Sequence, residues 1–263
     1  RMAAAAVADG RDVLLIVTDV SKTGLMAPTA DCASELQRRF AGRVTVMVDA
    51  CQFRLTPATV AAYLRRGFIV AVTGSKFLGG PSFCGALLIP PDAASALRGA
   101  PLPAALAAYS ARAEWPRQWR AAQTLPERAN YGLLLRWEAA RTELQALCRL
   151  PDAAVAGFLA GFAAAVQGHL RDHPHLSGLT VAPLHRGIAT DAAWDTIPTI
   201  FPFLLHRRGG GLLDHAAAAR VQRKLAHRGT AGRRFQLGQP VAVRWGDGQA
   251  GALEQLGDAL DLG

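Results

Sequence analysis

Short apolar runs alternate with segments of helical spacing along the first third of the chain. The runs at residues 13–17, 44–48 and 68–72 are almost continuously apolar, as in parallel strands whose two faces are both covered. Residues 29–40 and 56–67 lie between them and carry apolar side chains three to four positions apart, which predicts helices. This alternation predicts an α/β fold in which helices cover a mostly parallel sheet.

A fourth apolar run, at residues 85–89, follows the third strand after a short link. Residues 73–84 are few and rich in glycine, so they leave no room for the helix that a parallel crossover needs. We therefore expect the fourth strand to run antiparallel to the third.

The rest of the chain carries stronger helix signals than strand signals. Residues 92–126, rich in Ala, Pro and Arg, predict surface helix and connection, and helical spacing predicts a long helix over 127–150 and another over 153–170. The apolar face of the long helix is expected to carry Leu133, Leu134, Trp137, Leu144 and Leu147. Short strands and a terminal helix are expected later, at residues 180–182, 197–205, 240–245 and after Leu253.

These elements suggest a division of the chain into two domains. Residues 1–126 are expected to form part of a large cofactor-binding domain. Residues 127–150 are expected to form a linking helix. Residues 151–263 are expected to form a smaller α+β domain.

The charge balance is basic, with 29 Lys and Arg against 20 Asp and Glu and a net charge of +9. Only Lys22, Lys76 and Lys224 are lysines, so 29 − 3 = 26 residues are arginines. The arginines are scattered and form no basic stripe with interleaved aromatic residues, which argues against a nucleic-acid partner. Arginine bias with abundant Ala and Gly is typical of a GC-rich genome, and it makes each remaining lysine more informative.

The cysteines and histidines predict neither a disulfide framework nor a metal site. The four cysteines are widely spread without a C-x-x-C pair, and the seven histidines lie between residues 169 and 227, mostly beside Arg or Pro. No apolar run approaches the roughly 18 residues of a membrane span, and we see no signal peptide. A cytoplasmic protein without a membrane partner is therefore expected.

Polar residues follow three neighbouring predicted strands. Residues 21–24 follow the first, Asp49 and Gln52 the second, and residues 73–76 the third. Ligands of open α/β sheets bind outside the carboxyl ends of the strands, so we expect these side chains to converge on one site.

The residue types at these strand ends suit the binding of pyridoxal phosphate. A carboxylate at the end of a buried strand can keep the pyridine nitrogen protonated, which makes the ring an electron sink. A lysine at a neighbouring strand end can bind the cofactor covalently and then move a proton. Small hydroxyl residues in a glycine-containing turn can donate to a phosphate. The pattern therefore indicates Lys76 as the catalytic residue.

Residues 48–52 and 73–81 resemble the fold-type-I pyridoxal-phosphate enzymes, with the class V aminotransferases and cysteine desulfurases as the most similar branch. Those enzymes carry D-x-x-Q and, one helix and one strand later, S-x-H-K followed by a G-P turn. The corresponding letters here are D-A-C-Q and T-G-S-K-F-L-G-G-P. The chain departs from the pattern at Ser75, where the family usually has His, and at residues 21–24, where it often has N-E-x-G.

The resemblance implies a role for each matching residue. It implies that Lys76 forms the Schiff base, that Asp49 pairs with the pyridine nitrogen, and that Gln52 contacts the phenolic oxygen. It also places Thr73 and Ser75 near the phosphate.

Three further residues are weaker candidates. Ser21 takes the place of the family's asparagine, and Ser82 lies in the loop that often reaches the phosphate of the neighbouring subunit of a homodimer. Arg244 is the nearest arginine candidate for a substrate carboxylate.

The resemblance also leaves the reaction open. Transamination is the leading prediction, because Lys76 can shuttle a proton between two carbons without a further group. Desulfuration needs a thiolate on a later loop, and the only cysteine after Cys84 is Cys148, within a predicted helix. A lyase or racemase remains an alternative. Fold-type-I subunits are usually much longer, so a split enzyme with a partner chain supplying an N-terminal part, or a truncated non-catalytic subunit, is the rival prediction.

Overall fold

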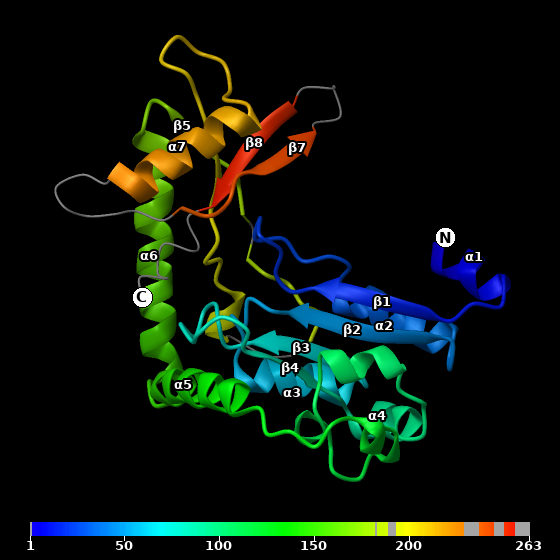
Figure 1. The fold of residues 1–263 in the computed structure, drawn as a ribbon. Helices are drawn as coiled ribbons and strands as arrows, with labels where there is room; N and C mark the ends of the chain where they lie inside the picture. The colour runs from blue at the N-terminus through cyan, green and yellow to red at the C-terminus, as the bar shows by residue number, and fades with distance from the viewer. Residues whose placement is uncertain (1, 182, 189–192, 229–236, 245–249, 256–263) are drawn as a thin grey trace. The chain divides into compact units, whose positions relative to one another are not determined.

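The computed structural model describes residues 2–181, 183–188, 193–228, 237–244 and 250–255 (Figure 1). The chain divides into two compact units. The first consists of residues 1–17, 28–147 and 187–190, and the second of residues 18–27, 148–186 and 191–263.

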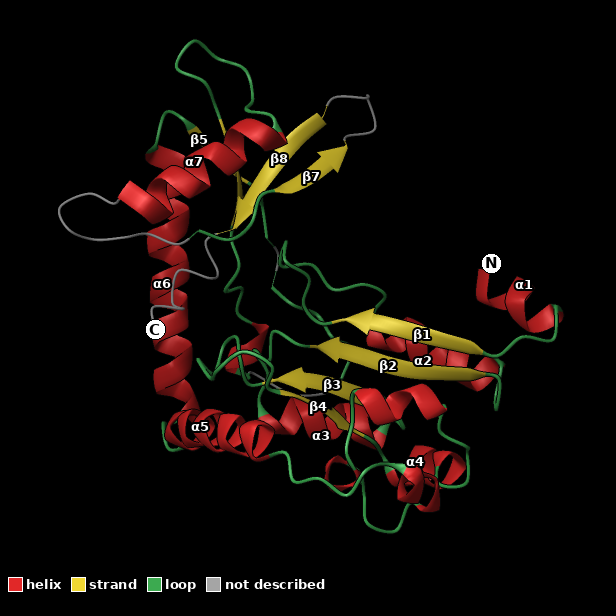
Figure 2. Cartoon of the chain, in the orientation of Figure 1, coloured by secondary structure: helices red, strands yellow, loops and turns green. Residues whose placement is uncertain are grey.

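A four-stranded sheet forms the centre of the first unit. Its strands follow the order β1 (Val13–Thr18), β2 (Val44–Ala50), β3 (Ile69–Thr73) and β4 (Gly85–Leu88). Strands β2 and β3 pair in parallel, and β4 pairs with β3 in the antiparallel direction. Figure 2 shows the arrows of β1, β2 and β3 pointing the same way. The predicted α/β class and the antiparallel fourth strand are therefore confirmed.

Two helices cover one face of this sheet. Helix α2 (Ala30–Arg39) packs on β2 and helix α3 (Pro57–Arg65) packs on β3, both behind the sheet in Figure 2. Each helix begins at a threonine whose side chain accepts a backbone N–H of the first turn, 3.2 Å for Thr29 and 3.1 Å for Thr56. The side chains beneath these helices are buried valines of the two central strands, Val46, Val48, Val70 and Val72.

The first unit also contains helices that precede β1 or follow β4 in the chain. They are α1 (Met2–Ala8), α4 (Pro91–Leu97), three short 3-10 helices (Ala104–Ala108, Arg112–Glu114, Arg120–Thr124) and α5 (Tyr131–Cys148). A small core of Trp119, Ala122 and Leu125 holds the 3-10 segments together.

Helix α5 matches its predicted apolar face except at Leu134. Leu134 is 54% exposed and Leu135 is 68% exposed, whereas Ala140 is fully buried. The Trp137 indole N–H donates to the Gly85 carbonyl oxygen at 3.2 Å. Leu133, Trp137, Leu144 and Leu147 are half-buried, as predicted, and only the placement of Leu134 on this face is wrong. The helix meets the loop after β3 through the small residue Ala140.

The second unit combines two helices with an antiparallel sheet. The helices are α6 (Asp152–Asp172) and α7 (His215–Arg228), with a 3-10 turn at Trp194–Thr196. The sheet has the order β5-β6-β8-β7, with bounds Leu176–Gly178, Pro202–Leu205, Ala250–Gln255 and Val241–Arg244. Its core is Leu170, Phe201 and Phe203, and Phe162 of α6 contacts the edge of the Phe201 ring.

Several expectations for this unit need correction. The strand expected at 180–182 lies instead at Leu176–Gly178, and only Pro202–Leu205 of the range 197–205 is a strand. Strand β8 runs to Gln255, and the rest of the terminal helix expected after Leu253 lies outside the described residues. Helix α7 was not predicted. Strands β5 and β6 are only three and four residues long, so partners far along the chain decide their bounds.

The sequence led us to expect no membrane-spanning segment, and helix α6 is the element that tests this expectation. By length and composition alone it is apolar enough to cross a membrane, the one helix of the described residues that passes this test. It also buries Val155, Leu159 and Leu170 and packs against β5. Most of the remaining side chains of α6 are exposed or half-buried, among them Phe158.

A buried ion cluster lies within the second unit. The Arg186 guanidinium donates to both carboxylate oxygens of Asp19, at 2.7 and 2.9 Å, and to the backbone oxygen of Asp195 at 2.7 Å. The Asp195 carboxylate lies 3.6 Å from the same guanidinium, and all three side chains are at most 3% exposed. Two buried carboxylates thus lie beside one buried arginine.

Replacing this arginine should destabilise the protein strongly. We expect Arg186→Met to lower the free energy of unfolding by about 3–5 kcal/mol, because it leaves buried charge uncompensated. Urea unfolding followed by circular dichroism measures the change. Arg207→Met is the matched control, since Arg207 and Asp214 form an exposed pair at 3.7 Å in the same unit, and its midpoint should stay near that of the wild type. Equal midpoints for the two variants would contradict the prediction.

Candidate functional site

Asp49 lies at the carboxyl end of β2, where the chain turns sharply. Its carboxylate accepts the backbone N–H of Cys51 at 3.1 Å, and the Phe53 N–H donates to the Ala50 oxygen at 2.8 Å. Phe53 has a φ of 51°, in the left-handed region that side chains other than glycine rarely adopt. The turn therefore holds the Asp49 carboxylate at the strand end.

Gln52 follows in the same turn and is buried. Its side chain is 6% exposed, yet its Oε1 has no hydrogen-bond partner among the described residues. An unsatisfied buried polar atom costs roughly 1–3 kcal/mol, so such atoms commonly mark a place where a ligand binds. A polar ligand beside Asp49 would satisfy this carboxamide.

The loop after β3 presents Thr73, Ser75 and Lys76. The Thr73 and Ser75 hydroxyls are 2.7 Å apart, and the Ser75 N–H donates to the Thr73 hydroxyl at 3.0 Å. Farther along, the Gly79 N–H donates to the Lys76 oxygen and the Gly80 N–H to the Gly74 oxygen, both at 2.8 Å. These bonds fold residues 73–80 into a compact loop with an exposed lysine side chain.

Two glycines let this loop press against helix α5. A Cβ at Gly74 would overlap the Ala140 side chain and would come within 2.8 Å of the Cys84 sulfur. A Cβ at Gly80 would meet the Gly74 oxygen at 2.6 Å and Ala140 at 2.9 Å. Only glycine fits at both positions, so the close contact with Ala140 determines the path of the loop that carries Lys76.

Charged groups at the ends of β2 and β3 both affect the pKa of the Cys51 thiol. The pKa of the Cys51 thiol is raised to about 11, first by burial, then by its hydrogen bond to Asp49 and by the Asp49 charge. The positive charge of Lys76 acts on the same thiol in the opposite direction. Asp49 and Lys76 therefore both act on the Cys51 thiol, from the turn after β2 and from the loop after β3.

A buried arginine joins the same two loops. Arg54 is 8% exposed, and its guanidinium carbon lies 5.3 Å from the centre of the Phe77 ring, next to Lys76. The face of an aromatic ring attracts a cation, so this contact connects the turn after β2 with the loop after β3. Our sequence interpretation overlooked Arg54; its place two residues after Gln52 was the available signal.

Comparison with known proteins gives matches among solved structures. No family model and no curated protein sequence matches the chain. The cystine C-S lyase C-DES, bound to cysteine persulfide, matches with 19% identity and a TM-score of 0.51 over 98% of this chain and 62% of that one. A C-DES variant with glycine covalently linked to the PLP cofactor matches with 18% identity and 0.53, over 96% and 58%. Mouse CSAD matches with 14% identity and 0.54, over 100% and 51%.

These neighbours are fold-type-I pyridoxal-phosphate enzymes. The chain shares their fold. The resemblance that the D-A-C-Q and T-G-S-K motifs indicate is thereby confirmed for the fold, at distant identity. The chain spans only 51–62% of the length of these fold-type-I structures.

The other predicted site residues are Ser21, Ser82 and Arg244. Ser21 belongs to the second unit, where its hydroxyl accepts the backbone N–H groups of Thr23 at 3.2 Å and Leu25 at 3.1 Å. Ser82 is exposed in the loop before β4. Arg244 ends β7, and its side chain lies outside the described part of the structure. Their contacts with a cofactor or substrate stay predictions.

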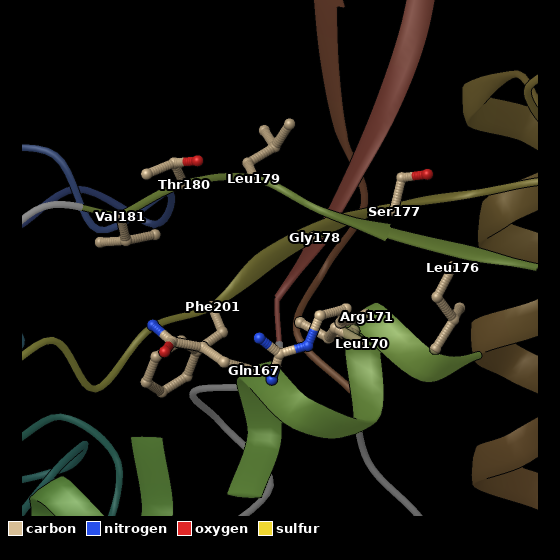
Figure 3. Close-up of a pocket in the computed structure, with 10 residues that line it drawn as sticks. All are labelled: Gln167, Leu170, Arg171, Leu176, Ser177, Gly178, Leu179, Thr180, Val181 and Phe201. Carbon is tan, nitrogen blue, oxygen red and sulfur yellow. The ribbon is translucent and has the colours of Figure 1, made fainter. Parts of the chain in front are cut away.

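A separate hollow lies within the second unit and contains none of the predicted site residues. It encloses about 510 Å³ between the end of α6 and strand β5 (Figure 3). Figure 3 shows Gln167 and Arg171 on the helix side and Ser177 and Thr180 on the opposite chain. No carboxylate or thiol lines it. In the described residues, no three His, Cys, Asp or Glu side chains are grouped as metal ligands.

The Cys51 thiol should react slowly with alkylating reagents. With a pKa of about 11, only about one molecule in a thousand carries the reactive thiolate at pH 8. Asp49→Asn removes the carboxylate charge that helps to raise this pKa, so alkylation of Cys51 by iodoacetamide should accelerate in the variant. Mass spectrometry of the Cys51 peptide across pH measures the rate, with exposed Cys148 as the internal reference. An unchanged pH profile in Asp49→Asn would contradict the contact.

Adding one methyl group to the loop should be costly. Gly74→Ala forces the loop away from Ala140 and Cys84, and overpacking of this kind costs about 1–3 kcal/mol in the free energy of unfolding. Chemical denaturation measures the loss. Gly99→Ala is the control, because nothing lies within 4 Å of a Cβ there. If both substitutions lower stability equally, the close contact with α5 does not constrain the loop.

Proposed function

We propose that this chain forms the pyridoxal-phosphate-binding part of a cytoplasmic enzyme that acts on an amino acid or an amine. The observation that carries the proposal is the grouping of Asp49, Gln52 and Lys76 at the carboxyl ends of two parallel strands, in a chain with the fold of such enzymes.

The residues present fit this cofactor. The unpartnered buried Oε1 of Gln52 supports a polar ligand beside the turn. Asp49 would bind the pyridine nitrogen, Gln52 the phenolic oxygen, and Thr73 and Ser75 would donate their hydroxyls to the phosphate. When bound, the cofactor supplies an electron sink for a substrate carbanion.

Lys76 would hold the cofactor covalently and then act as the acid-base group. Its side chain is exposed at the end of a well-packed loop, so its Nζ has the reach to remove and return a proton at the substrate α-carbon. Asp49 would supply the negative charge that keeps the pyridine nitrogen protonated. The thiol and backbone N–H of Cys51 orient that carboxylate.

Transamination is the leading reaction class in this proposal. It needs a single group that moves a proton between two carbons, and Lys76 is such a group. A lyase that breaks a carbon–sulfur bond is the second candidate, favoured by the likeness to the cystine C-S lyase. Transfer of the amino group to an added 2-oxo acid supports the first class, and sulfur release from cystine supports the second.

The remaining assignments extend this proposal to the assembly. We place the protein in a homodimer in which Ser82 reaches toward the neighbouring subunit's phosphate, with Ser21 near the cofactor and Arg244 at the substrate carboxylate. A chain that binds the cofactor or a partner without turnover is the alternative, since the neighbours are longer.

Covalent trapping of the cofactor at one lysine tests the proposal. After incubation with pyridoxal phosphate and reduction with borohydride, peptide mass spectrometry should find the pyridoxyl group on Lys76. The group should be absent from Lys76→Ala and unchanged in Lys224→Ala, because Lys224 lies on helix α7 of the second unit.

Two results would decide against the enzyme. Modification of Lys22 and Lys224 to the same extent as Lys76 would mean non-specific labelling, and no modification of Lys76 would mean no site in this chain. Specific trapping on Lys76 together with no turnover of amino acids or amines would favour the non-catalytic alternative.

A further inference from the structure

The hollow of the second unit has the dimensions of a small-molecule site. It lies between the end of helix α6 and strand β5, and we call it the α6–β5 hollow (Figure 3). Its volume of about 510 Å³ falls within the range of roughly 300–1,000 Å³ that is usual for such sites. None of the residues proposed for the cofactor or the substrate is among the described residues that line it, so any ligand here is a different one.

The helix side of the hollow presents a guanidinium group and a carboxamide. Gln167 and Arg171 are four positions apart on α6, so their side chains lie on one face of the helix, as Figure 3 shows. The Arg171 side chain is 76% exposed, and its Nε lies 3.8 Å from the Asp172 carboxylate, too far for a hydrogen bond. Of the described carboxylates, Asp172 is the only one within 4 Å of this guanidinium. The terminal nitrogens of Arg171 are therefore available to a ligand.

The chain across the hollow adds hydroxyl groups and apolar surface. Thr180 is exposed there, and the Ser177 hydroxyl lies 2.8 Å from Nε2 of His206. Leu179 and Val181 are half-buried on the same stretch of chain. A ligand bound by the helix side would therefore meet both hydroxyl groups and short apolar side chains on the other side.

The floor of the hollow is apolar and closely packed. Leu170 is 4% exposed and Phe201 is 1% exposed. A Cβ at Gly178 would come within 3.3 Å of the Leu170 side chain, so the chain after α6 lies directly against the helix at this point. Polar groups at the rim of an apolar floor fix the orientation of a bound small molecule.

The charges around the hollow select the ionic form of the ligand. Arg171 is the one residue with a permanent charge among the described residues that line it, and none of them is a carboxylate. A guanidinium group binds one carboxylate through two parallel hydrogen bonds. A zwitterionic amino acid would leave its ammonium group without a charged partner, and a phosphate dianion would keep one charge uncompensated. A 2-oxo acid avoids both problems, because its oxo oxygen is uncharged and accepts hydrogen bonds.

We propose that the α6–β5 hollow binds a small 2-oxo acid with a short apolar side chain. The Arg171 guanidinium binds the carboxylate, the Gln167 amide group donates to the 2-oxo oxygen, and the apolar side chain packs on Leu179 and Val181. This binding does not require the cofactor. One consequence rests on the proposed function: transamination converts an amino acid into a 2-oxo acid, so the product would also bind to the unit that does not contain Lys76.

Calorimetric titration with 4-methyl-2-oxopentanoate tests the proposal. The wild-type protein should bind this acid with a Kd of about 1 mM or lower. Arg171→Gln should weaken binding about tenfold or more, because it removes the charged hydrogen-bond donors. Arg223→Gln is the matched control, since it removes the same charge from an exposed position of α7 in the same unit, and its Kd should equal that of the wild type. Leucine, which has an ammonium group in place of the oxo oxygen, should show no binding that depends on Arg171.

A second variant tests the contact with the oxo oxygen. Gln167→Leu should weaken binding of 4-methyl-2-oxopentanoate about threefold to tenfold and leave that of 4-methylpentanoate unchanged, because the latter lacks the oxo group. Equal Kd values for Arg171→Gln and Arg223→Gln, or binding of leucine that Arg171→Gln abolishes, would overturn the proposal. Lys76→Ala should abolish cofactor trapping and leave the Kd for the 2-oxo acid unchanged, so the two proposals fail independently. A Kd that changes in Lys76→Ala and not in Arg171→Gln would assign the 2-oxo acid to the cofactor site instead.

Discussion

The parallel pairing of β2 with β3 is the constraint on which the site depends. Asp49 pairs with Ala71, so the turn after β2 and the loop after β3 leave the sheet at the same edge. Cys51 is close enough to Lys76 for the lysine charge to act on its thiol, and Arg54 stacks on Phe77 across the same gap. Residues 27 positions apart in sequence (76 − 49) thus become neighbours through strand geometry alone.

Close packing of small residues gives the lysine loop its shape. Gly74 and Gly80 meet each other and Ala140 of α5 without room for a methyl group, and the Gly80 N–H bonds to the Gly74 oxygen at 2.8 Å. A loop held by backbone contacts keeps its position without the help of Lys76. The lysine side chain is therefore left exposed and available for chemistry.

The two faces of the β1–β4 sheet differ in how much of their apolar surface is buried. Burial of Val46, Val48 and Val70 under two helices stabilises the parallel strands. On the opposite face the burial is uneven, because Ile69 is 8% exposed and Leu87 is 57% exposed. The site residues Asp49 and Thr73 point to this second side, at the carboxyl ends of β2 and β3.

By itself, the sequence determined the strand–helix alternation of residues 13–89, the antiparallel fourth strand and the grouping of Asp49, Gln52 and Lys76, because continuous apolar runs, threonine caps and short links are local signals. Tertiary structure decided the rest. Leu134 is exposed while Ala140 is buried, since α5 meets glycines that lie 60 or more residues earlier. Strands β5 to β8 and the Asp19–Arg186–Asp195 cluster join segments far apart in the chain, and no local pattern specifies such partners.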